Sequence, residues 1–272
     1  MDFGQFVSGL SDRVPRSERE YIADDGLLHC AVCHKQTQTR VTVFGKERTV
    51  RCICDCRHKE LQAEEERKRA YEREKVRKNC FDKDCMTEWN FANDDRSEPK
   101  LSDAAKRYAD NFETFREKRQ GLLLYGGCGS GKSFLAACIA NALIDKGKTV
   151  FMTDFATLIK RLQANFDGQY DIINDLCSCS LLIIDDLGIE RRTDYMQETV
   201  FNIIDSRYRS GKPMIITTNL TPEQIKGTQD IGQQRIYDRI LERCIPIKVD
   251  RPSRRREALK DNYAEAKELL GL

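Results

Sequence analysis

The sequence has no long hydrophobic run and almost no net charge. No stretch approaches the roughly 18 apolar residues of a membrane-spanning helix, and the opening residues MDFGQFVS lack the charged start and apolar core of an export signal. We therefore expect a cytoplasmic protein that does not bind membranes. Because 46 basic residues balance 44 acidic ones, the net charge is only +2, and any contact with nucleic acid must come from a local patch.

The chain is long enough for more than one folded unit. Its 272 residues, 40% of them hydrophobic, suffice for one α/β core and a smaller second unit.

Residues 126–133 read GGCGSGKS, which matches the phosphate-binding pattern G-x-x-x-x-G-K-[ST]. The apolar run 121–125 precedes them and the helical run 134–146 follows, which is the strand, loop and helix context that such a loop needs. A glycine-rich turn that carries a lysine by chance is the alternative. We expect backbone N–H groups to surround the phosphates of ATP, Lys132 to reach the β and γ phosphates, and Ser133 to hold Mg²⁺. The predicted nucleotide-binding residues are Gly127, Cys128, Gly129, Ser130, Gly131, Lys132, Ser133 and Phe134.

A second element of an ATP site lies about fifty residues farther along. Residues 181–186, LLIIDD, read as a buried strand that ends in two carboxylates. Asp185 is predicted to hold Mg²⁺, and Asp186 to orient the attacking water and help to deprotonate it. Many related ATPases carry glutamate at the second position, so the shorter Asp186 leaves the rate of hydrolysis open. A nucleotide-dependent binding protein with little hydrolysis is the corresponding alternative.

From residue 121 onward, strand-like and helix-like segments alternate. This order predicts an α/β fold with a parallel sheet that helices cover on both faces. A helix is expected before it, over 101–118, because apolar residues recur there at spacings of three and four. The predicted strands are 121–125, 149–153, 181–185, 213–218 and 245–249, and the predicted helices are 132–146, 155–166, 171–177, 194–210, 222–226, 232–243 and 253–269.

Five of the twelve cysteines and all three histidines lie within residues 29–58. Cys30 and Cys33 form a C-x-x-C pair, and residues 40–50 read as a hairpin of two short strands, as in a zinc ribbon. Thiolates suit tetrahedral Zn²⁺, and so small a unit needs a cross-link to fold. The other two ligands are expected among Cys52, Cys54 and Cys56, with His58 as a further option. An iron–sulfur cluster and unligated thiols stay open as alternatives.

Residues 59–78 are rich in charges of both signs and predict an exposed connecting helix. Opposite charges recur at a spacing of four, as in Glu64 with Lys68 and Glu65 with Arg69. The next segment, 79–99, is polar except for three aromatic residues, Phe81, Trp89 and Phe91, which we expect to anchor it to the ATPase core. Contact of one of them with the adenine ring is an alternative.

Two features beyond residue 213 suggest a response to the nucleotide. Asn219 follows the strand 213–218 and is a candidate γ-phosphate sensor, although asparagine is also a common turn residue. Arg235, Arg239 and Arg243 recur at steps of four along one helical face. An arginine that a neighbouring subunit supplies would neutralise charge during phosphoryl transfer. Ion pairing with nearby acids is the alternative.

Five ordered motifs together resemble one family. They are the phosphate loop, IIDDLG at 183–188, TTNL at 217–220, RIYDRI at 235–240 and SRRR at 253–256. Over roughly residues 80–265 the chain is similar to the DnaC/DnaI-type helicase loaders of bacteria and phages, within the AAA+ class that also contains the IstB transposition ATPases. The cysteine-rich front favours a loader, because IstB-type helpers usually lack such a module. Regulation of a transposase is the alternative.

The resemblance implies an ATPase, slow and stimulated by its partner, that binds single-stranded DNA, assembles into a homo-oligomer with ATP and delivers a hexameric replicative helicase onto DNA. It implies a helicase-binding zinc domain over 1–58, a helical linker over 59–99 and an AAA+ domain over 100–272 with a short C-terminal lid helix. By position it makes Arg239 the arginine finger, Arg235 a second member of that motif, and Arg255, or Arg254, the second sensor. Lys160, Arg161 and Phe166 are candidates for contact with DNA, although amphipathic helices often carry such residues.

Overall fold

The computed structural model describes residues 17–164, 168–188 and 194–251, and the single positions 253, 263, 267, 269 and 270. The chain divides into two compact units, Met1–Glu72 and Arg73–Leu272, and each is described by itself. Among the described residues, no helix is both long enough and apolar enough to cross a bilayer.

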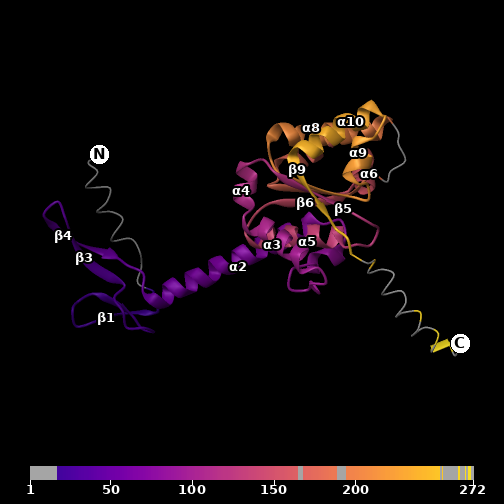
Figure 1. Cartoon of the computed structure of the whole chain (residues 1–272). Helices are drawn as coiled ribbons and strands as arrows, with labels where there is room; N and C mark the ends of the chain where they lie inside the picture. Colours follow the sequence, from indigo (N-terminus) through magenta and orange to yellow (C-terminus); the bar gives the residue numbers. More distant parts are fainter. Residues whose placement is uncertain are drawn as a thin grey trace. The chain divides into compact units, whose positions relative to one another are not determined.

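The first unit contains two small antiparallel sheets (Figure 1). β1 (Glu20–Ile22) pairs with β2 (Leu28–Cys30), and β3 (Gln38–Val43) pairs with β4 (Lys46–Arg51). Phe44 and Gly45 form the two-residue connection of β3 and β4, with φ of 50° and 72°. Two consecutive positive φ values are what a hairpin of this loop length requires. The hairpin predicted within residues 40–50 is therefore confirmed.

The helix α2 (Asp55–Cys80) follows the hairpin, and the boundary between the two units falls within it. Cys80 is its only buried residue, so the helix is exposed almost throughout. The predicted charge pairs form: Lys68 Nζ lies 3.2 Å from Glu64 Oε1, and Arg69 Nη2 lies 2.6 Å from Glu65 Oε1. An exposed helix at this place is confirmed, and it begins earlier than predicted.

The second unit contains a five-stranded parallel sheet in the order β6-β7-β8-β5-β9. Its strands are β5 (Gly121–Tyr125), β6 (Val150–Asp154), β7 (Leu181–Leu187), β8 (Met214–Thr218) and β9 (Cys244–Lys248). Because all five strands are parallel, each connection must return to the starting edge of the sheet, and it does so through helices. The carboxyl ends of β5, β7 and β8 lie at the same edge of the sheet, so the polar residues near these ends meet there.

Helices cover both faces of this sheet, and the alternation of side chains along β5 shows how. Leu122 and Leu124 pack in one core with residues of α5, whereas Leu123 packs in a second core with residues of α6, α8 and α10. Strands buried on both sides are continuously apolar, as predicted. The α/β fold with a covered parallel sheet is confirmed. The helices are α3 (Pro99–Asp110), α4 (Phe112–Glu117), α5 (Lys132–Asp145), α6 (Phe155–Ala164), α7 (Gln169–Ser178), α8 (Asp194–Ser210), α9 (Pro222–Lys226) and α10 (Ile231–Arg243).

The segment between α2 and α3 contains the short 3-10 helix η1 (Asp84–Glu88). Phe81 forms a parallel bridge with Met152, and Trp89 and Phe91 pack against the core that contains α5. Asn141 of α5 donates hydrogen bonds to the carbonyls of Met86, at 3.0 Å, and Trp89, at 2.8 Å. The prediction that the three aromatic residues anchor this segment is confirmed.

One predicted helix is interrupted in the structure, and another lies almost entirely outside the described residues. The single helix expected over 101–118 is wrong, because α3 and α4 are separated at Asn111, whose φ and ψ are −103° and 25°. The side-chain amide of Asn111 donates 2.9 Å to the carbonyl of Arg107, which caps the end of α3. The final helix expected over 253–269 falls almost entirely outside the described residues.

A buried arginine joins α7 and α8 to the sheet. Arg207 is 0% exposed, and its guanidinium donates hydrogen bonds of 2.7–3.2 Å to backbone carbonyls. The acceptors are Cys177, Cys179, Ser180 and Pro213. Burial lowers the pKa of this guanidinium from its ordinary value, and the carbonyl dipoles are what stabilises the charge.

Candidate functional site

The phosphate loop connects β5 directly to α5, and two of its glycines are required by the backbone. Gly126 and Gly129 have φ of 150° and 78°, where other residues are strained. A Cβ at Gly126 would lie 2.3 Å from the carbonyl oxygen of Val249. A Cβ at Gly129 would lie 2.3 Å from Ser253 Oγ. The loop is therefore tightly wrapped against the chain that leaves β9, and it ends at the N-terminus of α5, which favours a phosphate.

The side chain of Lys132 is folded into this loop. It is 4% exposed, and its ammonium donates to the carbonyls of Gly126, at 3.0 Å, and Gly127, at 2.9 Å, and to Asn219 Oδ1, at 2.7 Å. The loop lysine and the predicted sensor, which come from neighbouring strands, are therefore in direct contact.

The two predicted magnesium ligands are also in contact. Ser133 Oγ donates 2.8 Å to Asp185 Oδ1, and Thr217 Oγ1 donates 2.6 Å to the same oxygen. Asp185 is 4% exposed. Burial raises the pKa of its carboxyl group, and the hydrogen bonds from Thr217 and Ser133 oppose this shift. A hydroxyl beside a carboxylate oxygen is a suitable donor set for Mg²⁺, so these residues fit the ion that the loop implies.

Asp186 has an unusual backbone conformation. Its φ is 55°, and the pairing of β7 with β8 is irregular between Ile184 and Leu187. Thr217 Oγ1 accepts a 2.8 Å hydrogen bond from the N–H of Asp186, and Thr218 Oγ1 donates 2.7 Å to the carbonyl of Leu187. Two threonine hydroxyls of β8 thus hold the irregular end of β7. Their role was not predicted, although both belong to the TTNL motif and lie in the predicted strand 213–218.

Two of the three predicted arginines of α10, Arg239 and Arg243, contact other residues of their own chain. Arg239 Nε donates 2.8 Å to Asp205 Oδ1, and its guanidinium lies 4.7 Å from the ring centre of Phe201. The guanidinium of Arg243 lies 4.5 Å from the ring centre of Tyr208. Arg235 is exposed on the same helix.

The remaining residues that were predicted to contact DNA or the nucleotide fall into three groups. Arg161 is paired with Asp82, Nη2 to Oδ1 at 2.5 Å, and Lys160 is exposed. Phe134 packs against Trp89, with ring centres 5.9 Å apart. Arg254, Arg255 and Phe166 lie outside the described residues.

In the first unit, four of the five candidate cysteines converge. The sulfur atoms of Cys30, Cys33, Cys54 and Cys56 all lie within 4.8 Å of one another. Cys52 is not in this group, and its thiol donates 3.4 Å to the carbonyl of Gln36. Four thiols this close suit a tetrahedral zinc site, with two ligands from the C-x-x-C turn and two from the start of α2. Neither Cys52 nor His58 belongs to the group of possible ligands among the described residues.

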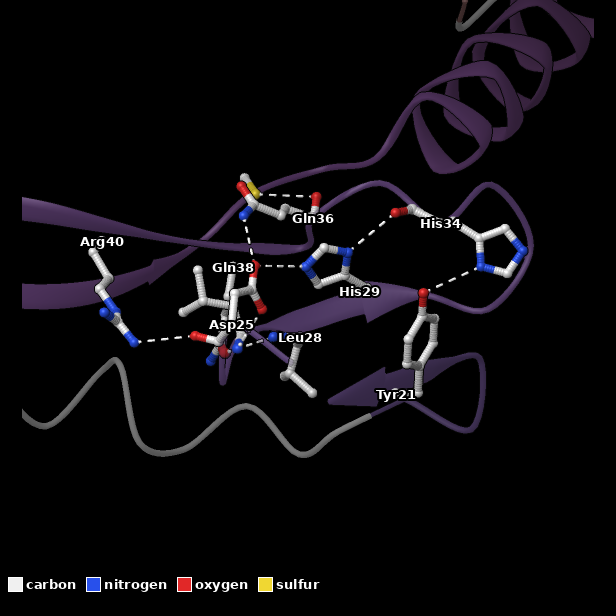
Figure 2. A network of polar contacts seen from close by, with 10 residues as sticks. Tyr21, Asp25, Leu28, His29, His34, Gln36, Gln38 and Arg40 are labelled. Atoms are coloured by element: carbon white, nitrogen blue, oxygen red, sulfur yellow. Dashed lines mark hydrogen bonds and ion pairs between the residues drawn. The ribbon is translucent and has the colours of Figure 1, made fainter. Parts of the chain in front are cut away.

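A polar network braces the C-x-x-C turn (Figure 2). Asp25 Oδ2 lies 3.0 Å from His29 Nε2 and accepts 2.9 Å from Gln36 Nε2, while His29 Nδ1 lies 3.1 Å from the carbonyl of His34. Hydrogen bonds lower the pKa of the Asp25 carboxyl group to about 2. The backbone N–H of Leu27 has the largest effect, and the side chains of His29 and Gln36 add to it. The pKa of the His29 imidazole is raised, mainly by its hydrogen bond to Asp25 and to a smaller extent by its hydrogen bond to the carbonyl of His34. These contacts fix the residues on either side of Cys30 and Cys33, as partners around a metal site do.

Comparison with known proteins agrees with this geometry. The family described as IstB-like ATP binding protein matches residues 28–261. The replicative helicase loader DnaC of Buchnera aphidicola subsp. Acyrthosiphon pisum (strain APS) is 30% identical over 156 residues, which cover 56% of this chain and 61% of that protein. The replicative helicase loader DnaI of Bacillus subtilis (strain 168) is 26% identical over 179 residues, 61% of this chain and 58% of that protein. The chain thus spans about three fifths of the length of these relatives.

Among solved structures, a crystal structure of the DnaC helicase loader matches with a TM-score of 0.54 and 26% identity, and covers 62% of this chain and 100% of that chain. The resemblance to DnaC/DnaI-type proteins that the motifs indicated is confirmed, and with it the AAA+ fold.

Proposed function

The chain belongs to the family of IstB-like ATP binding proteins, and from this premise we propose that it is an ATP-dependent loader of a hexameric replicative helicase. One observation carries the proposal. The loop lysine, the sensor asparagine, the loop serine and the strand-end aspartate converge at one edge of a parallel sheet, through contacts of 2.7 and 2.8 Å. This is the arrangement that binding and hydrolysis of ATP require.

Each residue has a role that follows from its position. Lys132 leaves its carbonyl partners to neutralise the β and γ phosphates, and Asn219, already beside the ammonium, senses the γ phosphate. Ser133 and Asp185 would hold Mg²⁺, which would supply positive charge beside the phosphates. Asp186 orients the attacking water and accepts its proton. Arg255 belongs to the second sensor.

Hydrolysis depends on assembly in this proposal. Arg239 acts in trans on the nucleotide of a neighbouring subunit of an ATP-bound homo-oligomer. To do so it must leave Asp205 and Phe201, its partners in the single chain. The contact between subunits replaces this ion pair when the homo-oligomer forms. Turnover is therefore slow until partners bind.

The two units have different partners in the proposal. Residues 1–58, with zinc held by Cys30, Cys33, Cys54 and Cys56, bind the helicase, and 59–99 link them to the ATPase domain over 100–272. Zinc supplies the cross-link that so small a unit lacks. The ATPase domain binds single-stranded DNA, with Lys160 as an exposed candidate contact. Arg161 contributes less, because it is paired with Asp82.

Regulation of a transposase is the second candidate function, and it is the weaker one. The relatives reported above are named as helicase loaders.

Co-purification with the cognate replicative helicase tests the proposal, with the full chain as bait and zinc content and ATP turnover measured on the same sample. We expect helicase retention, and turnover that rises with single-stranded DNA. Cys33→Ser should release both zinc and helicase, whereas Cys52→Ser should retain both. Retention of a transposase in place of the helicase would favour the second candidate.

A further inference from the structure

Thr217 joins the two carboxylate residues of β7 through a single hydroxyl group. It lies on β8, which is the strand between β7 and β5, and its side chain is fully buried. Its Oγ1 donates 2.6 Å to Asp185 Oδ1 and accepts 2.8 Å from the N–H of Asp186. One oxygen therefore contacts the side chain of the first acid and the backbone of the second.

The bond to Asp186 supports a strained conformation. A φ of 55° is uncommon for a residue other than glycine, and it persists only where the surroundings stabilise it. The irregular pairing between Ile184 and Leu187 takes the N–H of Asp186 out of the regular ladder, and the hydroxyl of Thr217 is its acceptor. Loss of this acceptor would leave a partly buried N–H group without that hydrogen bond, which would weaken the support for this conformation.

The bond to Asp185 fixes the rotation of its carboxylate. Ser133, at the start of α5, and Thr217, on the neighbouring strand β8, donate to the same oxygen, Oδ1. Two donors on one oxygen leave the carboxylate a single orientation.

We propose that Thr217 is a positioning residue that sets both acids of the ATP site at once and couples them to β8, the strand that ends beside Asn219. This inference rests on the proposed ATPase function. Valine has almost the same shape as threonine and the same preference for strands, so the hydroxyl group is the part that the inference requires.

The test compares Thr217→Val with Thr217→Ser in the full chain. For Thr217→Val we expect kcat to fall at least about tenfold, because small displacements of catalytic groups are costly, while ATP affinity changes less than about threefold. The Mg²⁺ concentration for half-maximal nucleotide binding should rise by a similar factor of about ten, since Asp185 loses its orientation. Thr217→Ser, which keeps the hydroxyl, should restore both quantities to within about threefold of wild type.

A matched control is Thr153→Val, because Thr153 is a 2% exposed threonine at the end of β6 that donates 2.5 Å to Asp82 and not to Asp185. It should leave kcat and the Mg²⁺ requirement near wild type. If Thr217→Val does not fold, Thr217→Ala and Thr217→Ser replace the pair, since they also differ by one oxygen.

Two results would overturn the inference: hydrolysis and Mg²⁺ requirement of Thr217→Val equal to wild type, or Thr217→Ser as defective as Thr217→Val. Its failure is distinguishable from that of the proposed function. If the wild-type chain binds Mg²⁺ and ATP but does not hydrolyse ATP, the ATPase proposal fails, and the Mg²⁺ requirement for binding still decides the role of Thr217.

Discussion

Lys132 Nζ donates a 2.7 Å hydrogen bond to Asn219 Oδ1, across 87 residues of sequence. The contact exists because β5 and β8 are parallel neighbours, so the loop after one strand and the residue after the other meet at the same edge. An ammonium that is already buried and hydrogen-bonded loses little conformational entropy when it binds a phosphate. The contact also explains how a phosphate at Lys132 would be detected at the end of β8.

The zinc site is predicted to use four particular cysteines. Cys33→Ser should lose most of the bound metal, which we expect at about one zinc ion per chain, because a tetrahedral site needs all four thiolates. Cys52→Ser should keep its zinc, since its sulfur lies outside the group of four. Elemental analysis of the purified variants checks this. Equal loss in both variants would mean that the cluster includes Cys52.

Gly126→Ala is predicted to destabilise the ATPase unit. Its Cβ would lie 2.3 Å from a backbone oxygen at a φ of 150°, and such strain costs about 2 kcal/mol or more. Thermal unfolding without nucleotide should show a decrease of several degrees in Tm. Gly127→Ala is the control, because its Cβ meets nothing within 4 Å. A similar decrease for both variants would contradict the loop geometry.

Asp186→Asn is predicted to separate binding from hydrolysis. Asparagine tolerates a positive φ as well as aspartate does, so the backbone should stay in place, but the amide cannot accept a proton. We expect the rate of ATP hydrolysis to fall about 100-fold or more, with ATP affinity within about threefold of wild type. Single-turnover kinetics and nucleotide titration measure the two effects. Unchanged hydrolysis would exclude Asp186 as the base.

Arg207→Met is predicted to destabilise the fold, although Arg207 does not contact the described residues of the ATP site. It would remove the donors for carbonyls at Cys177, Cys179, Ser180 and Pro213, and buried acceptors without partners should cost at least about 3 kcal/mol in total. Arg209→Met, two positions along α8, removes an ion pair that the exposed guanidinium of Arg209 forms with Asp205, and it should cost less than Arg207→Met because Asp205 keeps its pair with Arg239. Denaturant unfolding compares the two, and equal losses would contradict the account.

The sequence predicted best where a motif and hydrophobicity agree. The segments 121–125, 181–186 and 213–218 were recognised because apolar runs precede glycines, acids or Asn219, and these residues meet as expected. The break at Asn111 was not predictable, because the apolar stripe continues through it. The choice among Cys52, Cys54 and Cys56 depends on where α2 begins, which alternating cysteines do not reveal. Asp205, the ion-pair partner of Arg239, lies on α8, 34 residues away in the sequence, and only the fold brings them together.

The binding of ATP by Lys132→Ala tests the central claim most directly. The account predicts that the wild-type chain binds ATP with Mg²⁺ and that Lys132→Ala loses at least about 100-fold in affinity, because a charge-assisted contact with two phosphates is removed. Lys146→Ala, at the other end of α5, removes a surface pair with Asp110 and should bind as the wild type does. Unchanged ATP affinity in Lys132→Ala would contradict the account.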